Sequence, residues 1–386
     1  MDAIAAKIGV DKIEIRKRNL ISKIAMPYKL GLETLGTDIV YDSGDYALLL
    51  DKALTQADWK NLQAQLLKRR AGGEKVGAGV AMFVEKSGLG PFDTVKIEVK
   101  SDGSIEVVTG VASLGQGVET AIAQIAADAL GVNYCNVKVV HGQTNRIDKG
   151  MGAFASRVTV MCGEAARLAA VKLRAELLKT AAELMQTKAH LLDLFDGQIV
   201  FLDHSSGASM PLAELARQHP NGLAAEATFE SAHMVYPYGV HAAVVRVDAD
   251  TGAITIERYV IAYDIGKAVN PKLVEGQIAG GFAQGLGGAL LEEFQYDENG
   301  EPLSVTFADY LMPTAREIPA LSILITEDAP SPLNPLGLKG AGEGGANPVG
   351  AAIASAIDDA LGRPGAVTRL PVSPQRLKAL CRAPRS

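Results

Sequence analysis

Four glycine-rich segments, each beside or within an alanine-rich stretch with helical spacing, constrain the fold of this chain more than any other feature. Glycine loses more conformational freedom on folding than other residues, so it is kept where the backbone turns sharply or where another group approaches it closely. The chain has 40 glycines and few aromatic residues. We therefore expect tight backbone packing around 113–120, 150–157, 280–288 and 337–350.

The last of these segments holds one carboxylate, Glu343, in a loop that is otherwise almost bare backbone. Asn347 is a preferred N-cap residue and Pro348 suits the first helical position, so we expect a helix to begin there. Glu343 would then lie just ahead of a helix N-terminus with little side-chain bulk around it. This arrangement suggests a catalytic base beside a bound cofactor.

The first segment places Gly115, Gln116 and Gly117 directly before a predicted helix. Backbone N–H groups at a helix N-terminus suit a phosphate or another anion, and the Gln116 amide adds a donor and an acceptor. A turn between a strand and a helix that needs glycine only for tight packing explains the same residues. The sequence leaves both interpretations open.

The second segment has Ala155, Ser156 and Arg157 at the start of another predicted helix. Small residues let a ligand contact the backbone, and Ser156 is either a ligand contact or the N-cap of the helix. Arg157 pairs with an anion or, as is commoner for arginine, faces solvent.

The third segment places several glycines inside a predicted helix. Each costs roughly 1 kcal/mol relative to alanine in a helix interior, so their number indicates close approach by a partner helix, a backbone segment or a ligand. Gln284 is the long polar side chain of this patch, and if buried it needs hydrogen-bond partners. A helix–helix contact with one hydrogen-bonded glutamine is the alternative to a ligand site.

Residues 340–345 formally satisfy the GxGxxG pattern of dinucleotide-binding proteins. That fingerprint directly follows a buried strand, whereas the predicted strand at 321–326 is separated from it by a proline-rich stretch. The acidic residue expected at the end of the next strand is also missing, because Asp358 and Asp359 lie on the following helix. The context therefore argues against a dinucleotide site.

Length and composition are those of an ordinary globular protein with room for two domains or one large two-part domain. The formal net charge of −6 and the lack of a dense Lys/Arg run argue against a nucleic-acid partner. We find neither a membrane-spanning stretch nor a signal-peptide pattern, so we expect a cytoplasmic protein. The three cysteines and six histidines have no spacing typical of iron–sulfur or zinc sites.

Helices come first along the chain, and strands alternate with helices from Val76 onward, which predicts an α+β fold with mixed sheets. We expect a helical segment at 1–75 and a second domain at 76–386. Helices are predicted at 1–22 (two short ones), 44–70, 118–130, 156–184, 271–293 and 348–361. Strands are predicted at 79–84, 94–100, 105–109, 198–202, 242–248, 253–263 and 321–326, with a hairpin turn at Asp102-Gly103 and an extended C-terminal tail.

Taken together and in this order, these segments resemble the molybdopterin-binding subunit of the xanthine oxidase family of molybdenum hydroxylases. The resemblance runs along nearly the whole chain: Arg16-Lys17-Arg18-Asn19 is similar to an "RRKN" segment of the family, and the similarity continues through 113–120, 152–157, 263–287 and 339–344. It implies that residues 1–75 correspond to the end of the first molybdopterin-binding domain and residues 76–386 to the second, built of two intertwined α+β subdomains.

The resemblance also implies roles for the candidate residues. Molybdenum would be held through a pterin dithiolene with no bond from the protein, and Glu343 would take the proton from a molybdenum-bound hydroxide whose oxygen attacks an electron-poor carbon of the substrate. Lys339 would either contact the cofactor or make a structural ion pair. The pterin, expected in its cytosine dinucleotide form, would be bound by Gly115, Gln116, Gly117, Ala155, Ser156, Arg157, Gln284, Lys339 and Gly340. Part of the substrate pocket would be lined by Met82, Phe83 and Glu85.

The family's subunit carries several hundred residues before the position that corresponds to Met1, so the resemblance implies one half of a split molybdenum subunit. Such a chain would be active together with its N-terminal half, a subunit with two [2Fe–2S] clusters and an FAD subunit. The substrate would be a nitrogen heterocycle, nicotinate- or purine-like, or an aldehyde. The alternative is a non-catalytic binding or scaffold protein derived from the same fold.

Overall fold

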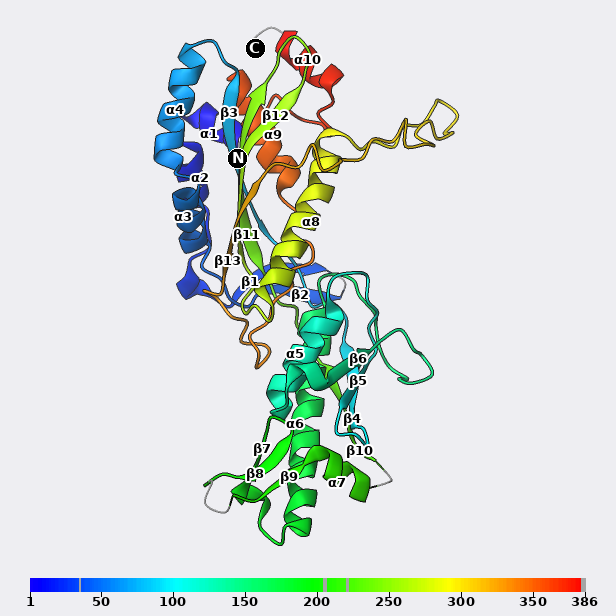
Figure 1. Cartoon of the computed structure of the whole chain (residues 1–386). Coiled ribbons are helices and arrows are strands. Elements are labelled where there is room, and N and C mark those ends of the chain that lie inside the picture. Colours follow the sequence, from blue (N-terminus) through cyan, green and yellow to red (C-terminus); the bar gives the residue numbers. More distant parts are fainter. Residues whose placement is uncertain (35, 204–206, 220–221, 383–386) are drawn as a thin grey trace.

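Two four-stranded sheets, each with its own helices, form two lobes of the chain (Figure 1). The computed structural model describes residues 1–34, 36–203, 207–219 and 222–382. Both sheets contain parallel and antiparallel neighbours. The predicted α+β class with mixed sheets is therefore confirmed.

The first lobe is built on a sheet with the strand order β13–β12–β11–β3, in which β12 and β13 are parallel and the other neighbours antiparallel. Helices α8 and α9 cover one face of this sheet, and α3 and α4 cover the other (Figure 1). The bounds are α3 Tyr46–Gln56, α4 Trp59–Ala71, β3 Val76–Val84, β11 Tyr238–Val247, β12 Ile254–Asp264, α8 Pro271–Leu290, β13 Leu321–Thr326 and α9 Val349–Leu361.

Glycines in β3 allow α9 to lie directly against the sheet. A Cβ atom on Gly77 would lie 2.2 Å from the backbone N of Ala360, and one on Gly79 would lie 2.3 Å from the backbone O of Ala352. Successive side chains of a strand point to opposite faces. Phe83 therefore packs on the α9 side of the sheet, whereas Met82 packs on the α3 side.

The first 75 residues contain a hairpin that the sequence analysis did not predict, formed by β1 (Tyr28–Thr34) and β2 (Thr37–Tyr41). The two short N-terminal helices are confirmed as α1 (Asp2–Ile8) and α2 (Lys12–Arg18). The single helix predicted at 44–70 is wrong, because α3 and α4 are separated by Asp58. The φ angle of Asp58 is 47°, a left-handed conformation that interrupts a helix.

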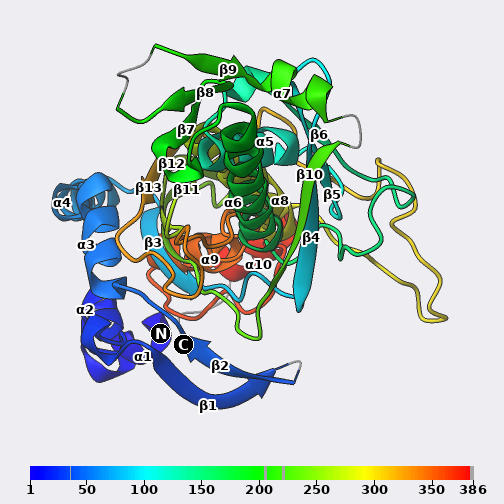
Figure 2. The same ribbon diagram turned by 90° about the horizontal axis from the view of Figure 1, so that it is seen from below.

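The second lobe is built on a sheet with the order β10–β4–β5–β6, and the long helix α6 packs against it (Figure 2). The predicted turn at Asp102-Gly103 joins the antiparallel pair β4 and β5. No helix in the described ranges is both long and apolar enough to cross a membrane. The bounds are β4 Phe92–Val99, β5 Ile105–Thr109, α5 Val118–Leu130, β6 Val137–Val140, α6 Val158–Leu184, β7 Leu192–Phe195, β8 Gln198–Phe201, β9 Ser209–Pro211, α7 Leu212–Gln218 and β10 Leu223–Glu230.

Two predictions near the C-terminus are wrong. Residues 374–382 form α10 (Pro374–Arg382) instead of an extended tail, because Leu377 is buried against the core of the first lobe; residues 383–386 lie outside the described part. Asn347 is not the N-cap of α9. Its N–H donates to Glu343 O at 3.2 Å within a turn, so the helix begins later, at Val349, with Pro348 at the cap position.

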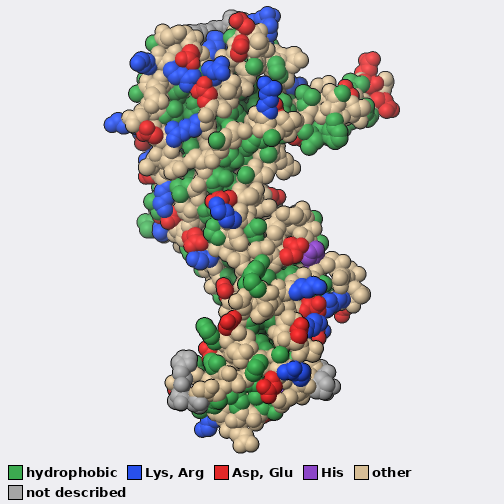
Figure 3. Space-filling model, in the orientation of Figure 1, with side chains coloured by type: hydrophobic (Ala, Val, Ile, Leu, Met, Phe, Trp, Pro, Cys, Tyr) green, Lys and Arg blue, Asp and Glu red, His purple; other side chains and the backbone are tan. Residues whose placement is uncertain are grey.

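The segment between α8 and β13 extends from the first lobe as a long arm (Figure 1). It exposes large apolar side chains, among them Phe294, Val305 and Phe307, the last with 81% of its surface accessible. Figure 3 shows hydrophobic side chains along the arm. Contiguous exposed apolar surface of this kind marks a contact region.

The glycines of α8 provide a test of the packing. Replacing Gly285 by alanine would place Cβ 2.7 Å from Val349 Cγ2 and 2.9 Å from Ala346 O, and we expect a loss of about 1–3 kcal/mol of stability. Gly280→Ala in the same helix meets no atom within 4 Å, and we expect a gain of up to about 1 kcal/mol. Urea unfolding of the two variants measures both, and an equal effect would contradict the proposed helix contact.

Candidate functional site

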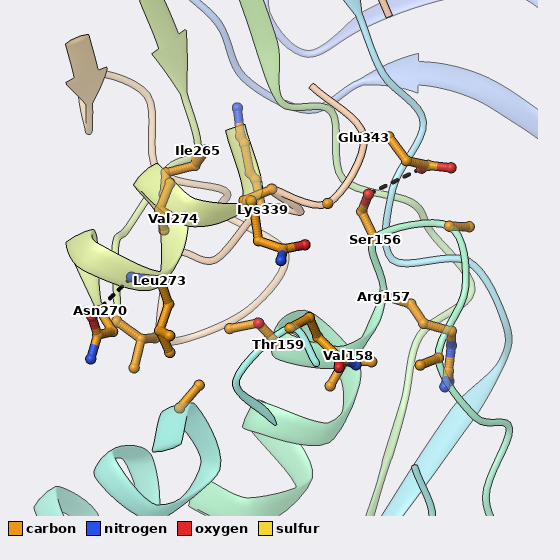
Figure 4. Close-up of a pocket in the computed structure, with 18 of the residues that line it drawn as sticks. Ser156, Arg157, Val158, Thr159, Ile265, Asn270, Leu273, Val274, Lys339 and Glu343 are labelled. Carbon is orange, nitrogen blue, oxygen red and sulfur yellow. Dashed lines mark hydrogen bonds between the residues drawn. The ribbon is translucent and has the colours of Figure 1, made fainter. Parts of the chain in front are cut away.

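A pocket of about 380 Å³ lies where the two lobes meet, and Glu343 forms part of its wall (Figure 4). The second lobe contributes residues around Gln116 and Ser156. The first lobe contributes the end of β12, the start of α8 and the loop that carries Glu343. Three of the four glycine-rich segments predicted from the sequence therefore contribute to one pocket.

The loop carrying Glu343 is fixed through its backbone at Gly340. The Gly340 N–H donates to Ser87 Oγ at 3.0 Å, and the Tyr263 hydroxyl lies 3.0 Å from Gly340 O. The exposed Glu343 carboxylate accepts one hydrogen bond from Ser156 Oγ at 3.0 Å (Figure 4). Glu343 is thus held in place while remaining open to the pocket.

The glycines of this loop are explained by the close approach of other protein segments. A Cβ atom on Gly340 would lie 2.4 Å from Ser156 Cβ. A Cβ atom on Gly344 would lie 2.2 Å from Cζ of Tyr263. The glycines therefore reflect contact between the loop and its supports.

The turn before α6 has an unusual backbone. Ala155 and Ser156 have φ angles of 46° and 49°, a region that residues with a side chain rarely adopt and that clusters at functional sites. Ser156 does not cap α6, because Arg157 is the N-cap residue and no side chain makes a capping bond. Within the described part of the chain, the N–H groups of Ala155 and Ser156 have no acceptor, so both can donate to a ligand.

Arg157 is fully buried instead of facing solvent. Its guanidinium pairs with the buried Asp93 at 2.6 Å and donates to the backbone oxygens of Leu89, Phe92 and Gly152. These bonds tie the residue next to Ser156 to several segments of the protein. Arg157 therefore fixes the turn that holds Ser156.

The Gln116 side-chain amide makes hydrogen bonds to the backbone of its own loop. Its Oε1 accepts from Leu114 N at 2.6 Å, and its Nε2 donates to Ala112 O at 3.4 Å. Gly115 and Gly117 both have positive φ angles. A Cβ atom on Gly117 would lie 2.6 Å from Leu273 Cδ2, whereas one on Gly115 would meet no atom within 4 Å. The lack of a side chain at Gly117 therefore lets the two lobes approach each other. At Gly115 the space beside the backbone is empty.

Three predicted residues lie elsewhere. Gln284 is exposed on α8 and does not line this pocket. In the same helix Gly281 approaches the loop before α9, and Gly285 approaches both this loop and Val349 at the start of α9. Met82 packs on the α3 side of the sheet, the face opposite to that of Phe83. Phe83 packs in the core, with its ring 5.5 Å from that of Tyr263.

Lys339 lies beneath the loop and is almost fully buried. Its ammonium donates to Ser43 O at 3.2 Å and lies over the Tyr238 ring, and in the described ranges it forms no direct ion pair. Burial lowers its pKa, against the attraction of Asp42 and Asp264. Lys339 therefore supports the loop from the protein side.

Glu85 is buried beside the Glu343 loop. The Tyr263 hydroxyl lies 3.0 Å from Glu85 Oε2. Burial raises the pKa of Glu85 to about 8, and the Glu343 carboxylate adds to the rise, while hydrogen bonding from Ser156 and Tyr263 opposes it. Of the predicted pocket residues, the structure brings Glu85 together with Glu343.

The sequence analysis did not assign a role to two residues that support the site, Asn270 and Tyr263. Asn270 accepts from Leu273 N at 3.2 Å and caps α8 at the pocket (Figure 4). Its side-chain amide also donates to Gln124 Oε1 across the lobes. The Asn270-Pro271 pair is a helix-start signal that could have revealed it. Tyr263 could not be found in this way, because its contacts are distant in sequence.

The described residues contain no cluster of three or more His, Cys, Asp or Glu side chains that could hold a metal ion. The pocket instead offers one exposed carboxylate, free backbone N–H groups and small residues. This donor set suits an organic ligand with acceptor atoms more than a bare metal.

A family model for the molybdopterin cofactor-binding domain matches residues 52–319, more than half of the chain. The chain is also 31% identical to the xanthine dehydrogenase molybdenum-binding subunit of Escherichia coli O157:H7, over 98% of this chain and 50% of that subunit. The chain belongs to the xanthine oxidase family of molybdenum hydroxylases.

Two further similarities agree with this family. The gamma subunit of the 6-hydroxypseudooxynicotine dehydrogenase complex of Paenarthrobacter nicotinovorans is 39% identical over 98% of this chain and 49% of its own length. The crystal structure of quinoline 2-oxidoreductase from Pseudomonas putida 86 superposes with a TM-score of 0.87 at 32% identity, covering 98% of this chain and 50% of that one. The chain thus spans about half the length of these molybdenum hydroxylase relatives.

The buried ion pair at the turn gives a second test. Arg157→Met would leave Asp93 buried and unpaired, and we expect a loss of about 3–5 kcal/mol of stability. The matched control, Arg18→Met, removes an exposed pair with Glu14 and should cost less than about 0.5 kcal/mol. Chemical denaturation measures both, and a mild effect of Arg157→Met would show that the pair does not hold the turn.

Proposed function

We propose that this chain supplies the base and part of the cofactor site of a molybdenum hydroxylase. The enzyme would insert water-derived oxygen at an electron-poor carbon of a small substrate. The observation that carries the proposal is the exposed Glu343 carboxylate, fixed by Ser156 at the wall of a pocket between the lobes. Its loop is the one that the family resemblance assigns to the base.

The residues present fit a molybdenum pterin. Gly115 and Gly152 have open space where a Cβ atom would be, and the N–H groups of Ala155 and Ser156 are free to donate. Gly115, Gln116 and Gly117 precede the N-terminus of α5, which favours negatively charged groups. When bound, the molybdenum pterin would supply the Lewis acid and the two-electron acceptor of the reaction.

The chain's own contribution is proton transfer and positioning. Glu343 would accept a proton on its carboxylate, and the hydrogen bond from Ser156 keeps that carboxylate at the pocket wall. The hydrogen bonds of the Gly340 backbone with Ser87 and Tyr263 fix the position of the loop. Arg157 and Lys339 would act indirectly, by supporting the turn and the loop.

We further propose that the substrate is a nitrogen heterocycle rather than an aldehyde, because the relative and the solved structure just described are named for nitrogen compounds. The pterin would carry a cytosine dinucleotide, and the protein would act in the cytoplasm. Residues 1–75 would close the first molybdopterin-binding domain and 76–386 would form the second.

Partners follow from the same comparison. Since the chain spans about half the length of its relatives, we propose that a further polypeptide stretch supplies the other half, together with [2Fe–2S] and FAD subunits. The exposed apolar arm between α8 and β13 supports such contacts. A non-catalytic scaffold built on the same fold is the alternative.

Glu343→Gln tests the base. In the complex co-expressed from the neighbouring genes, we expect turnover to fall by about 10²–10⁴-fold with unchanged molybdenum and pterin content. The control Glu14→Gln removes a partly exposed carboxylate of α2, outside the residues that line the pocket, and should leave turnover unchanged. Steady-state kinetics with metal and pterin analysis measures all three proteins.

Two results would contradict the proposal. Near-normal turnover of Glu343→Gln would reject Glu343 as the base. A stable complex without molybdenum would favour the scaffold.

A further inference from the structure

Glu85 and Glu343 form a pair of carboxyl groups, of which Glu343 lines the pocket and Glu85 lies buried behind it. Glu343 is exposed, whereas Glu85, just after β3, is only 6% exposed. The Ser156 hydroxyl donates to Glu343 Oε2 at 3.0 Å and also interacts with the Glu85 carboxyl. The two groups therefore share one neighbourhood but have very different access to water.

The hydrogen bonds of Tyr263 show which group carries a proton. The Tyr263 oxygen lies 3.0 Å from both Glu85 Oε2 and Gly340 O, and its hydroxyl has one hydrogen. A carbonyl and an ionised carboxylate can only accept, so an ionised Glu85 would leave one contact without a hydrogen. A protonated Glu85 satisfies both, because it donates to Tyr263 while Tyr263 donates to Gly340 O.

Burial and charge favour the same state. Glu85 Oε1 is buried with no hydrogen-bond partner among the described residues, which is far more costly for an ionised group than for a neutral acid. The groups facing Glu85 are Ser156 before α6, Tyr263 of β12 and Glu343 of the loop, and none of them is a cation. Two like charges this close disfavour each other.

We propose that Glu85 is a positioning residue for Glu343: it holds the single proton of the carboxyl pair, and as a neutral acid it completes the Tyr263–Gly340 contact that fixes the loop. Glu343 is then the exposed member of the pair, with its carboxylate at the pocket wall. This inference rests on the proposed function of Glu343 as the base. It assigns the two carboxyl groups different tasks because of their different environments.

The pH dependence of stability tests where the proton lies. Because the pKa of folded Glu85, about 8, is above the ordinary value of 4.5, the folded chain retains a proton that the unfolded chain loses between these values. Stability should therefore fall as pH rises through this window. Relative to Glu85→Gln, the unfolding constant of the full wild-type chain should rise by up to about tenfold per pH unit.

The comparison with Glu85→Gln isolates one group, because every other buried acid is present in both proteins. Glu343→Gln removes the neighbouring charge and should move the upper limit of the window to lower pH. Urea unfolding at a series of pH values measures all three chains. Parallel pH dependence of wild type and Glu85→Gln would overturn the proposal.

The positioning role has its own readout in the complex. Glu85→Gln keeps a neutral donor for Tyr263 and should retain more turnover than Glu85→Leu, which has no donor. Equal kcat values for the two variants would overturn positioning through Tyr263. Retained turnover of Glu343→Gln would instead reject the proposed base, whereas the pH dependence of wild type against Glu85→Gln would still report where the proton lies, so the two failures are distinguishable.

Discussion

The two lobes meet at a crowded contact, where the turn at Ser156 lies directly against the backbone of Gly340. A Cβ atom at position 340 would lie 2.4 Å from Ser156 Cβ, so any larger residue would push the loop and the turn apart. Ser87 and Tyr263 hold the two backbone polar groups of Gly340. The position of Glu343, three residues further on, depends on this contact, and so does its hydrogen bond with Ser156.

The Arg157 and Lys339 side chains near the pocket are buried, whereas the Glu343 carboxylate is exposed. Arg157 and Asp93 satisfy each other in the interior, and Lys339 points into the protein beneath the loop. Neither cation is free to neutralise Glu343 at the pocket wall. A single exposed carboxylate beside free backbone N–H groups fits the proposed base next to an organic cofactor. The buried Arg157–Asp93 pair and Lys339 support the turn and the loop around it.

Local signals predicted the parts of the fold that local chemistry decides. Helix α5 begins after Gly117 and ends at Gly131 as predicted, and the loop of Glu343 lies at a pocket. Asp58, which interrupts the predicted 44–70 helix, has a left-handed backbone that no strong local signal marks. The burial of Leu377 in α10 likewise depends on residues far away in the sequence.

The same distinction applies to the site. Glu343 and Ser156 could be selected from the sequence because glycine-rich segments surround them, although their mutual hydrogen bond could not. Arg157 could not be placed, since its partner Asp93 lies 64 residues earlier. The contacts of Tyr263 with Glu85 and Gly340 are equally long-range, and they required the folded chain to become visible.

Anomalous scattering at the molybdenum absorption edge, from crystals of the purified complex, would locate the metal without assuming a role for any residue. The proposed function predicts a peak in the pocket between the lobes, with the Glu343 carboxylate facing it and still accepting from Ser156. A peak in another cavity, or Glu343 turned away from a metal in this pocket, would contradict the central claim that this carboxylate is the base.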